Sequence, residues 1–126
     1  MKKSIICAIA LLASMNARAA QYIFANVTGH LLPGYKVEIR DPKDNLLATL
    51  ENGKSAYVRD CPSYQLRAFS DSKKKGNPLN FTPSTKDTTK NVIIVKFGKM
   101  LNHIRVSQTT LEKAKKEYGK RVQFPA

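Results

Sequence analysis

The chain has 126 residues, 22 of them Lys or Arg and 9 of them Asp or Glu, which gives a formal net charge of +13 at pH 7. Its 42% of hydrophobic residues excludes a chain too polar to fold, and its two cysteines exclude a small domain held together by several disulfides. A charge this positive favours polyanionic partners and carries no information about the fold.

The first residues have the organisation of a secretory leader. Lys2 and Lys3 are followed by an apolar run from Ile5 to Ala13 and by Ala17-Arg18-Ala19, the small-x-small pattern that signal peptidase cleaves. We therefore expect residues 1–19 to be a cleaved signal peptide and the product to be periplasmic or secreted. The apolar run is shorter than the ~20 residues that span a bilayer, so we do not expect an integral membrane protein.

Removal of the leader would leave residues 20–126, roughly 107 residues, which is a common size for a single domain. This part has 19 basic and 9 acidic residues, a net charge of +10. Cys61 is then its only cysteine, so no disulfide within the chain is expected. Three roles are open to this residue: an inert thiol, a disulfide-linked partner, or a nucleophile paired with a histidine. The first is favoured, because neighbouring Asp60 opposes formation of a thiolate.

Strands and turns are predicted from the start of this domain. Gln21 to Val27 is rich in aromatic and β-branched residues and predicts a first strand. Gly34 to Arg40 alternates, with Val37 and Ile39 on one face, as a half-buried strand requires. Asp41-Pro42-Lys43-Asp44 predicts a turn with proline at its second position.

Asn52-Gly53 is the strongest turn signal in the chain. It separates the apolar runs Leu46 to Leu50 and Ser55 to Arg59. Since Asn and Gly tolerate positive φ best, the sequence predicts a type I′ hairpin in which Thr49 lies opposite Ala56. Both faces of this hairpin are apolar, so we expect it to be covered on both sides.

The middle of the chain changes character after one more strand. Ser63 to Phe69 alternates and predicts a half-buried strand. Residues 70–90 form a long polar loop, either functional or mobile, rich in Ser, Thr, Lys and Asn. Leu79 and Phe81 predict a short edge strand inside it, between two prolines.

The C-terminal third predicts a hairpin and a helix. Asn91 to Phe97 is apolar on both faces, as expected for the most central strand, and Leu101 to Ser107 is its partner. Thr109 with Glu112 predicts a capping box that begins a short helix ending at Gly119. The pattern as a whole predicts a mainly β fold, a small antiparallel β-sandwich or barrel of about seven strands with one short C-terminal helix.

Residues suited to catalysis are scarce. No glycine-rich phosphate loop, nucleophile elbow or metal-ligand spacing is present, so we assign no catalytic residue, metal or cofactor. Carboxylates such as Glu38, Asp41, Asp44 and Asp60 are more simply explained by turn chemistry and solvated charge than by glycoside hydrolysis.

Basic residues are the remaining candidates for binding. Five residues are predicted to point away from the core on alternating strands and to form a basic surface: Lys36, Arg40, Arg67, His103 and Arg105. A basic loop and a basic helix face are further candidates: Lys73, Lys74, Lys75, Lys113, Lys116 and Lys120. In the plainer interpretation, unrelated strands, a loop tip and a helix each expose solvated charge.

Two functions are consistent with these patterns. The first is an exported, non-enzymatic binding or assembly module of the cell envelope, whose partner is an anionic polymer or an envelope protein. The second is a small basic secreted hydrolase or toxin such as a nuclease, in which His30 or His103 would transfer protons. Salt distinguishes the two kinds of partner in the first case, because phosphate-type contacts weaken with ionic strength and apolar interfaces do not.

Overall fold

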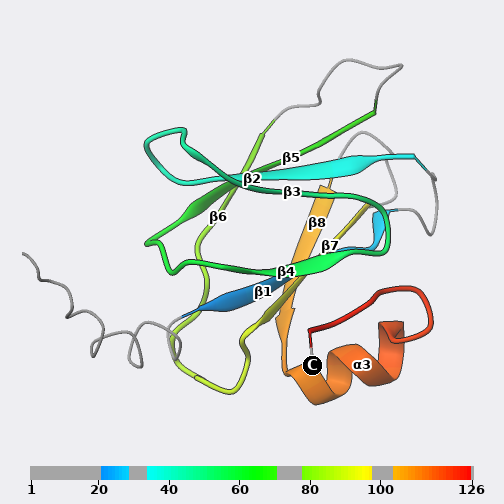
Figure 1. Ribbon diagram of the computed structural model, residues 1–126. Helices are drawn as coiled ribbons and strands as arrows, with labels where there is room; N and C mark the ends of the chain where they lie inside the picture. Colours follow the sequence, from blue (N-terminus) through cyan, green and yellow to red (C-terminus); the bar gives the residue numbers. More distant parts are fainter. Residues whose placement is uncertain (1–20, 29–33, 71–77, 98–103, 126) are drawn as a thin grey trace, which may run out of the picture.

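A computed structural model describes residues 21–28, 34–70, 78–97 and 104–125 (Figure 1). The predicted leader, His30, the Lys73-Lys74-Lys75 run and His103 lie outside these ranges. The described ranges contain the following elements: β1 (Tyr22–Asn26), β2 (Lys36–Arg40), β3 (Leu46–Leu50), β4 (Ser55–Val58), β5 (Tyr64–Phe69), β6 (Leu79–Phe81), β7 (Val92–Phe97), β8 (Ile104–Thr109) and α3 (Leu111–Tyr118).

The strands form two sheets of four, with the orders β4-β1-β7-β8 and β3-β2-β5-β6. Neighbouring strands are antiparallel except β1 and β7, which are parallel. Figure 1 shows three layers: the β3-β2-β5-β6 sheet, the β4-β1-β7-β8 sheet, and α3 on the far side of the latter. The predicted β-sandwich with a C-terminal helix is confirmed, and the alternative of a barrel is not.

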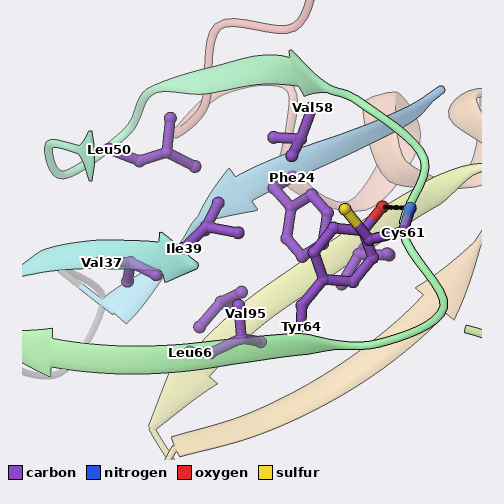
Figure 2. Close-up of a cluster of buried hydrophobic side chains, with 10 residues drawn as sticks. Phe24, Val37, Ile39, Leu50, Val58, Cys61, Tyr64, Leu66 and Val95 are labelled. Carbon is purple, nitrogen blue, oxygen red and sulfur yellow. Dashed lines mark hydrogen bonds between the residues drawn. The ribbon is translucent and has the colours of Figure 1, made fainter. Parts of the chain in front are cut away.

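The space between the sheets is filled by alternating side chains from both (Figure 2). Phe24 and Val95 come from one sheet and Ile39 and Leu66 from the other, and all four are fully buried. The predicted alternation of Gly34 to Arg40 and of Ser63 to Phe69 is therefore confirmed, because Val37, Ile39, Tyr64 and Leu66 all face this core.

A second core lies between the β4-β1-β7-β8 sheet and the helix. Ile23, Ala25 and Ile94 project from the sheet, and Ala114 of α3 and Val122 of the C-terminal segment pack against them. β7 therefore has apolar residues on both faces and a hydrogen-bonded strand on each side, which confirms it as the central strand. Among the described residues, no helix has the length and apolar character needed to cross a membrane.

The predicted Asn52-Gly53 hairpin is wrong. β3 pairs with β2 and β4 pairs with β1, so the two strands diverge after the turn and enter different sheets. The turn closes through a 3.0 Å bond from Lys54 N–H to Glu51 C=O, with positive φ (77°) at Gly53 but not at Asn52, as in a type II turn. Both strands are apolar because each belongs to a different sheet of the sandwich. They do not form one hairpin that is covered on both faces.

A buried asparagine fastens this turn to the end of β1. Asn26 is fully buried, and its side-chain amide donates to the carbonyls of Tyr35 (3.1 Å) and Leu50 (2.9 Å). Its Oδ1 accepts from the Thr28 N–H and hydroxyl at 2.9 and 2.6 Å. Its backbone also exchanges hydrogen bonds with the turn, accepting from Gly53 N–H and donating to Lys54 C=O. Asn26 therefore bridges the two sheets where the chain crosses between them.

The helix begins one residue later than predicted. Thr110, not Thr109, is the N-cap, and its hydroxyl accepts from the Lys113 N–H at 3.2 Å. Thr109 remains in β8, where it pairs with Val92. Thr109 and Thr110 are adjacent. Because Thr109 pairs with Val92 in the sheet, Thr110 caps the helix. The helix is followed, as predicted, by Gly119, which keeps right-handed helical φ and ψ.

Candidate functional site

The outer face of the β3-β2-β5-β6 sheet carries three of the five residues predicted to form a basic surface. Lys36 and Arg40 lie on β2 and Arg67 lies on adjacent β5. They alternate with the buried residues Val37, Ile39 and Leu66, so they point away from the core. Lys36 lies opposite Phe69, and Arg67 lies opposite Glu38. We call Lys36, Arg40 and Arg67, with Glu38 among them, the basic face.

A buried carboxylate lies within this face. Glu38 is only 6% exposed, although it points to the outer side of the sheet. Arg40 Nε donates to Glu38 Oε1 at 2.8 Å, and one terminal nitrogen of Arg40 donates to the Asp44 carbonyl, also at 2.8 Å. The bond to Glu38 raises the pKa of Arg40 above its ordinary value. Arg40 is therefore a structural cation, whose charge is largely balanced inside the sheet.

Arg67 differs from Arg40 in how its guanidinium is satisfied. Its Nε is buried and has no hydrogen-bond partner among the described residues. Burial of an N–H donor without an acceptor is costly, and such groups are rare in folded proteins. Arg67 therefore differs from Arg40 in that its Nε is not satisfied by the described residues, although this atom is shielded from solvent in the structure.

The other predicted basic residues are not part of this face. Arg105 is exposed on β8, opposite Lys96, in the other sheet. The expectation that it shares one surface with Arg67 is therefore wrong. Lys113, Lys116 and Lys120 are exposed on and after α3. His103, Lys73, Lys74 and Lys75 lie outside the described residues.

A hollow lies at the end of the sandwich where β1 begins. It has a volume of about 360 Å³ and is lined by Tyr22, the connection between β4 and β5, and the segment after β6. The lining residues of the two connections are Asp60, Cys61, Pro62, Thr82, Pro83 and Thr85. Burial raises the pKa of the Tyr22 phenol, and the nearby charge of Asp60 adds to this. The phenol therefore stays protonated at neutral pH.

Cys61 is held in place by the corner next to it. Tyr64 is fully buried, and its hydroxyl donates to Arg59 C=O at 2.7 Å. The same hydroxyl accepts from Cys61 N–H at 3.0 Å, the bond dashed in Figure 2. Cys61 itself is 7% exposed and its thiol is free. Burial raises the pKa of this thiol, which disfavours the thiolate needed for nucleophilic attack or disulfide exchange.

The carboxylate of Asp41 has the role in turn structure that the sequence predicts. Asp41 Oδ1 accepts from the backbone N–H groups of Lys43 and Asn45, both at 2.9 Å. Its Oδ2 accepts from the Asn45 side chain at 3.0 Å and from Arg59 at 2.8 Å. These bonds occupy the acceptor sites of a carboxylate that is 4% exposed. Within the described ranges, no three His, Cys, Asp or Glu side chains converge as a set of metal ligands.

Sequence reasoning missed the burial of Glu38 and the hollow. The alternation of the strand predicts that Glu38, between Val37 and Ile39, faces solvent. Only the cross-strand register places Arg67 opposite it. The hollow combines three segments far apart in the chain, so no local spacing marks it. Comparisons with known proteins add no family, because no family model, no curated protein and no solved structure matches this chain.

Proposed function

We propose that this protein is an exported, non-enzymatic binding module of the cell envelope that contacts an anionic polymer through the basic face. The observation that carries the proposal is Arg67, a cation on an outward sheet face whose buried Nε lacks a partner among the described residues. Lys36 on the neighbouring strand supplies a second cation. The predicted leader and the net charge of +10 for residues 20–126 agree with a polyanion in the envelope.

The difference between the two sheets supports this choice of surface. The outer face of the β4-β1-β7-β8 sheet packs against α3 and the C-terminal segment. In the described part of the chain, no helix packs on the outer face of the other sheet, whose side chains are polar or charged at Lys36, Glu38 and Arg67. A partly charged sheet face suits repeated contacts along a polymer better than recognition of a small molecule.

Salt dependence of binding tests the proposal. The probe is a duplex of about 20 base pairs of DNA, because each phosphate contact is known to contribute a slope of about −0.9 in log K against log salt. The double variant Lys36→Gln/Arg67→Gln should bind more weakly and lose about two units of slope. The control Arg105→Gln/Lys116→Gln removes the same charge from the opposite side of the molecule and should leave the slope unchanged.

Equal effects of the two double variants would mean that only net charge matters, and would contradict the assignment of the basic face.

A second experiment distinguishes an anionic polymer from a protein partner, by passing envelope extract over the immobilised protein. Retained anionic polymer that elutes with salt supports the proposal, whereas a discrete protein that remains bound at high salt would replace it with an assembly role. The disulfide-linked partner at Cys61 is not included, because the thiol is buried.

The hydrolase alternative has no support in the described part of the chain, since His30 and His103 both lie outside it. Incubation with RNA and DNA between pH 5 and 8, where histidine titrates, checks it directly. Cleavage that His103→Ala abolishes would contradict a non-enzymatic module.

A further inference from the structure

The hollow at the start of β1 is separate from the basic face and has a different chemistry. Its walls come from Tyr22, from the Asp60-Cys61-Pro62 corner and from the segment Thr82 to Thr85. Its volume of about 360 Å³ lies in the range of sites that hold small ligands. The corner is fixed from inside by the two hydrogen bonds of the Tyr64 hydroxyl, so this wall is already formed before any ligand binds.

The hollow has an apolar floor and a polar mouth. Cys61 and Pro83 are buried and Tyr22 is partly buried, which gives the floor one aromatic ring, a thiol and a proline ring. Asp60, Pro62, Thr82 and Thr85 are exposed and supply one carboxylate, one proline ring and two hydroxyls at the mouth. This lining favours a ligand that places an apolar group inward and a polar group near Asp60.

Asp60 sets the sign of that polar group. It is the only charged residue among those described around the hollow, and its charge acts on the neighbouring Tyr22 phenol. The adjacent cation, Arg59, is directed to Asp41, with 2.8 Å between its terminal nitrogen and Oδ2. On a strongly basic protein, the described lining of the hollow thus carries one negative charge and no positive charge, although the Arg59 cation is close enough to act on Cys61.

We propose that the hollow binds the N-terminal residue of a polypeptide, with its α-ammonium group on Asp60 and its apolar side chain against Tyr22 and Pro83. In such a residue the charge and the side chain leave the same carbon, so one group lies at the mouth while the other fills the floor. Lysine fits less well, because its ammonium is at the tip of the apolar stem and would enter the floor first. The hydroxyls of Thr82 and Thr85 are available to the remaining N–H groups.

Nuclear magnetic resonance titration with two dipeptides tests the proposal. Leucyl-alanine amide carries the free α-ammonium, and its N-acetylated form has the same side chains without the charge. We expect the free amine to shift the amide resonances of Tyr22, Cys61 and Thr85 with a dissociation constant on the order of 1 mM, as suits so small a ligand. Acetylation should weaken binding roughly tenfold or more. Absence of shifts with the free amine would overturn the proposal.

Variants of the carboxylate complete the test. Asp60→Asn should weaken binding of the free amine to the level of the acetylated peptide, and Asp60→Glu should restore part of it. Asp44→Asn is the matched control, since Asp44 is an exposed carboxylate in another turn and its φ of 69° is one that Asn tolerates. Equal loss in this control would overturn the role of Asp60.

Two further outcomes separate this site from others. Equally tight binding of Nα-acetyl-lysine amide would overturn the assignment to an α-amine. The salt slope for the DNA duplex should be the same in Asp60→Asn and the unmodified protein, because the hollow does not include Lys36 or Arg67. Failure of the basic face and failure of the hollow are therefore distinguishable.

Discussion

The two sheets of the sandwich share one core but differ in what lies on their other sides. The β4-β1-β7-β8 sheet buries Ile23, Val92 and Ile94 under α3 and the C-terminal segment. On the β3-β2-β5-β6 sheet, the side facing away from the shared core carries Lys36, Glu38 and Arg67. Within the described residues, the first sheet packs apolar side chains on both faces, whereas the outer face of the second carries charged side chains, of which Glu38 and the Arg67 Nε are buried.

The largest expected effect is a core truncation on the helix side of the first sheet. Ile94→Ala removes a fully buried side chain that packs under α3, so we expect a loss of about 4 kcal/mol in the free energy of unfolding. Gln65→Ala, on the outer face of β5, should cost less than about 1 kcal/mol. Urea denaturation of both variants checks the comparison. Similar losses would mean that both sheets are covered alike.

A smaller effect is expected where the chain crosses from one sheet to the other. Gly53 has a φ of 77°, and an added Cβ would lie 2.8 Å from the Arg121 carbonyl oxygen. Its backbone also donates to Asn26 and accepts from Gln123 N–H at 2.9 Å. Gly53→Ala should therefore cost about 2 kcal/mol, through strain and displacement of the C-terminal segment.

Measurement of Gly53→Ala by thermal or urea unfolding, with Asn52→Ala as the control, separates the two turn positions. Asn52 is exposed and lacks positive φ, so its substitution should change stability little. A larger effect at Asn52 than at Gly53 would support the type I′ hairpin that the structure contradicts.

The smallest effect on the free energy of unfolding is expected at Asp41, in the turn that follows β2, and it depends on pH. Hydrogen bonds from the side chain and backbone of Asn45 hold the pKa of Asp41 below its ordinary value, and Lys43 N–H and Arg59 contribute. The stabilisation is complete above the unfolded-state pKa of about 3.9, and it is lost as pH falls through the lower folded-state pKa. The stability difference between the protein and Asp41→Asn should therefore narrow below about pH 4. A difference that stays constant down to pH 2 would contradict this role.

The sequence predicts those parts of the fold that depend on local alternation. Val37 with Ile39, Tyr64 with Leu66, and the doubly apolar β7 all lie as their spacing indicates. The type I′ hairpin was wrong because β3 and β4 find partners elsewhere, in β2 and β1, and local turn propensity does not report on them. The predicted helix cap is also wrong by one residue because of a strand pairing, since Thr109 pairs with Val92 in the sheet.

The candidate sites are less predictable because they depend on contacts between distant segments. The placement of Lys36 and Arg67 on one face of adjacent strands needs the β2–β5 pairing, and the separation of Arg105 needs the assignment of β8 to the other sheet. Asp60 beside Tyr22 follows from the return of the chain after β4 to the start of β1. The sequence gives the charge of each of these residues, but it does not show which residues lie next to them in the fold.

The parallel pairing of β1 with β7 has a consequence for when the domain folds. Ile23 pairs with Val92, so the first strand has no parallel partner until most of the chain is available. A chain that emerges from a ribosome N-terminus first holds β1 unpaired on that side until its last quarter appears. Closing so long a loop is slow, so the β4-β1-β7-β8 sheet is completed late in synthesis.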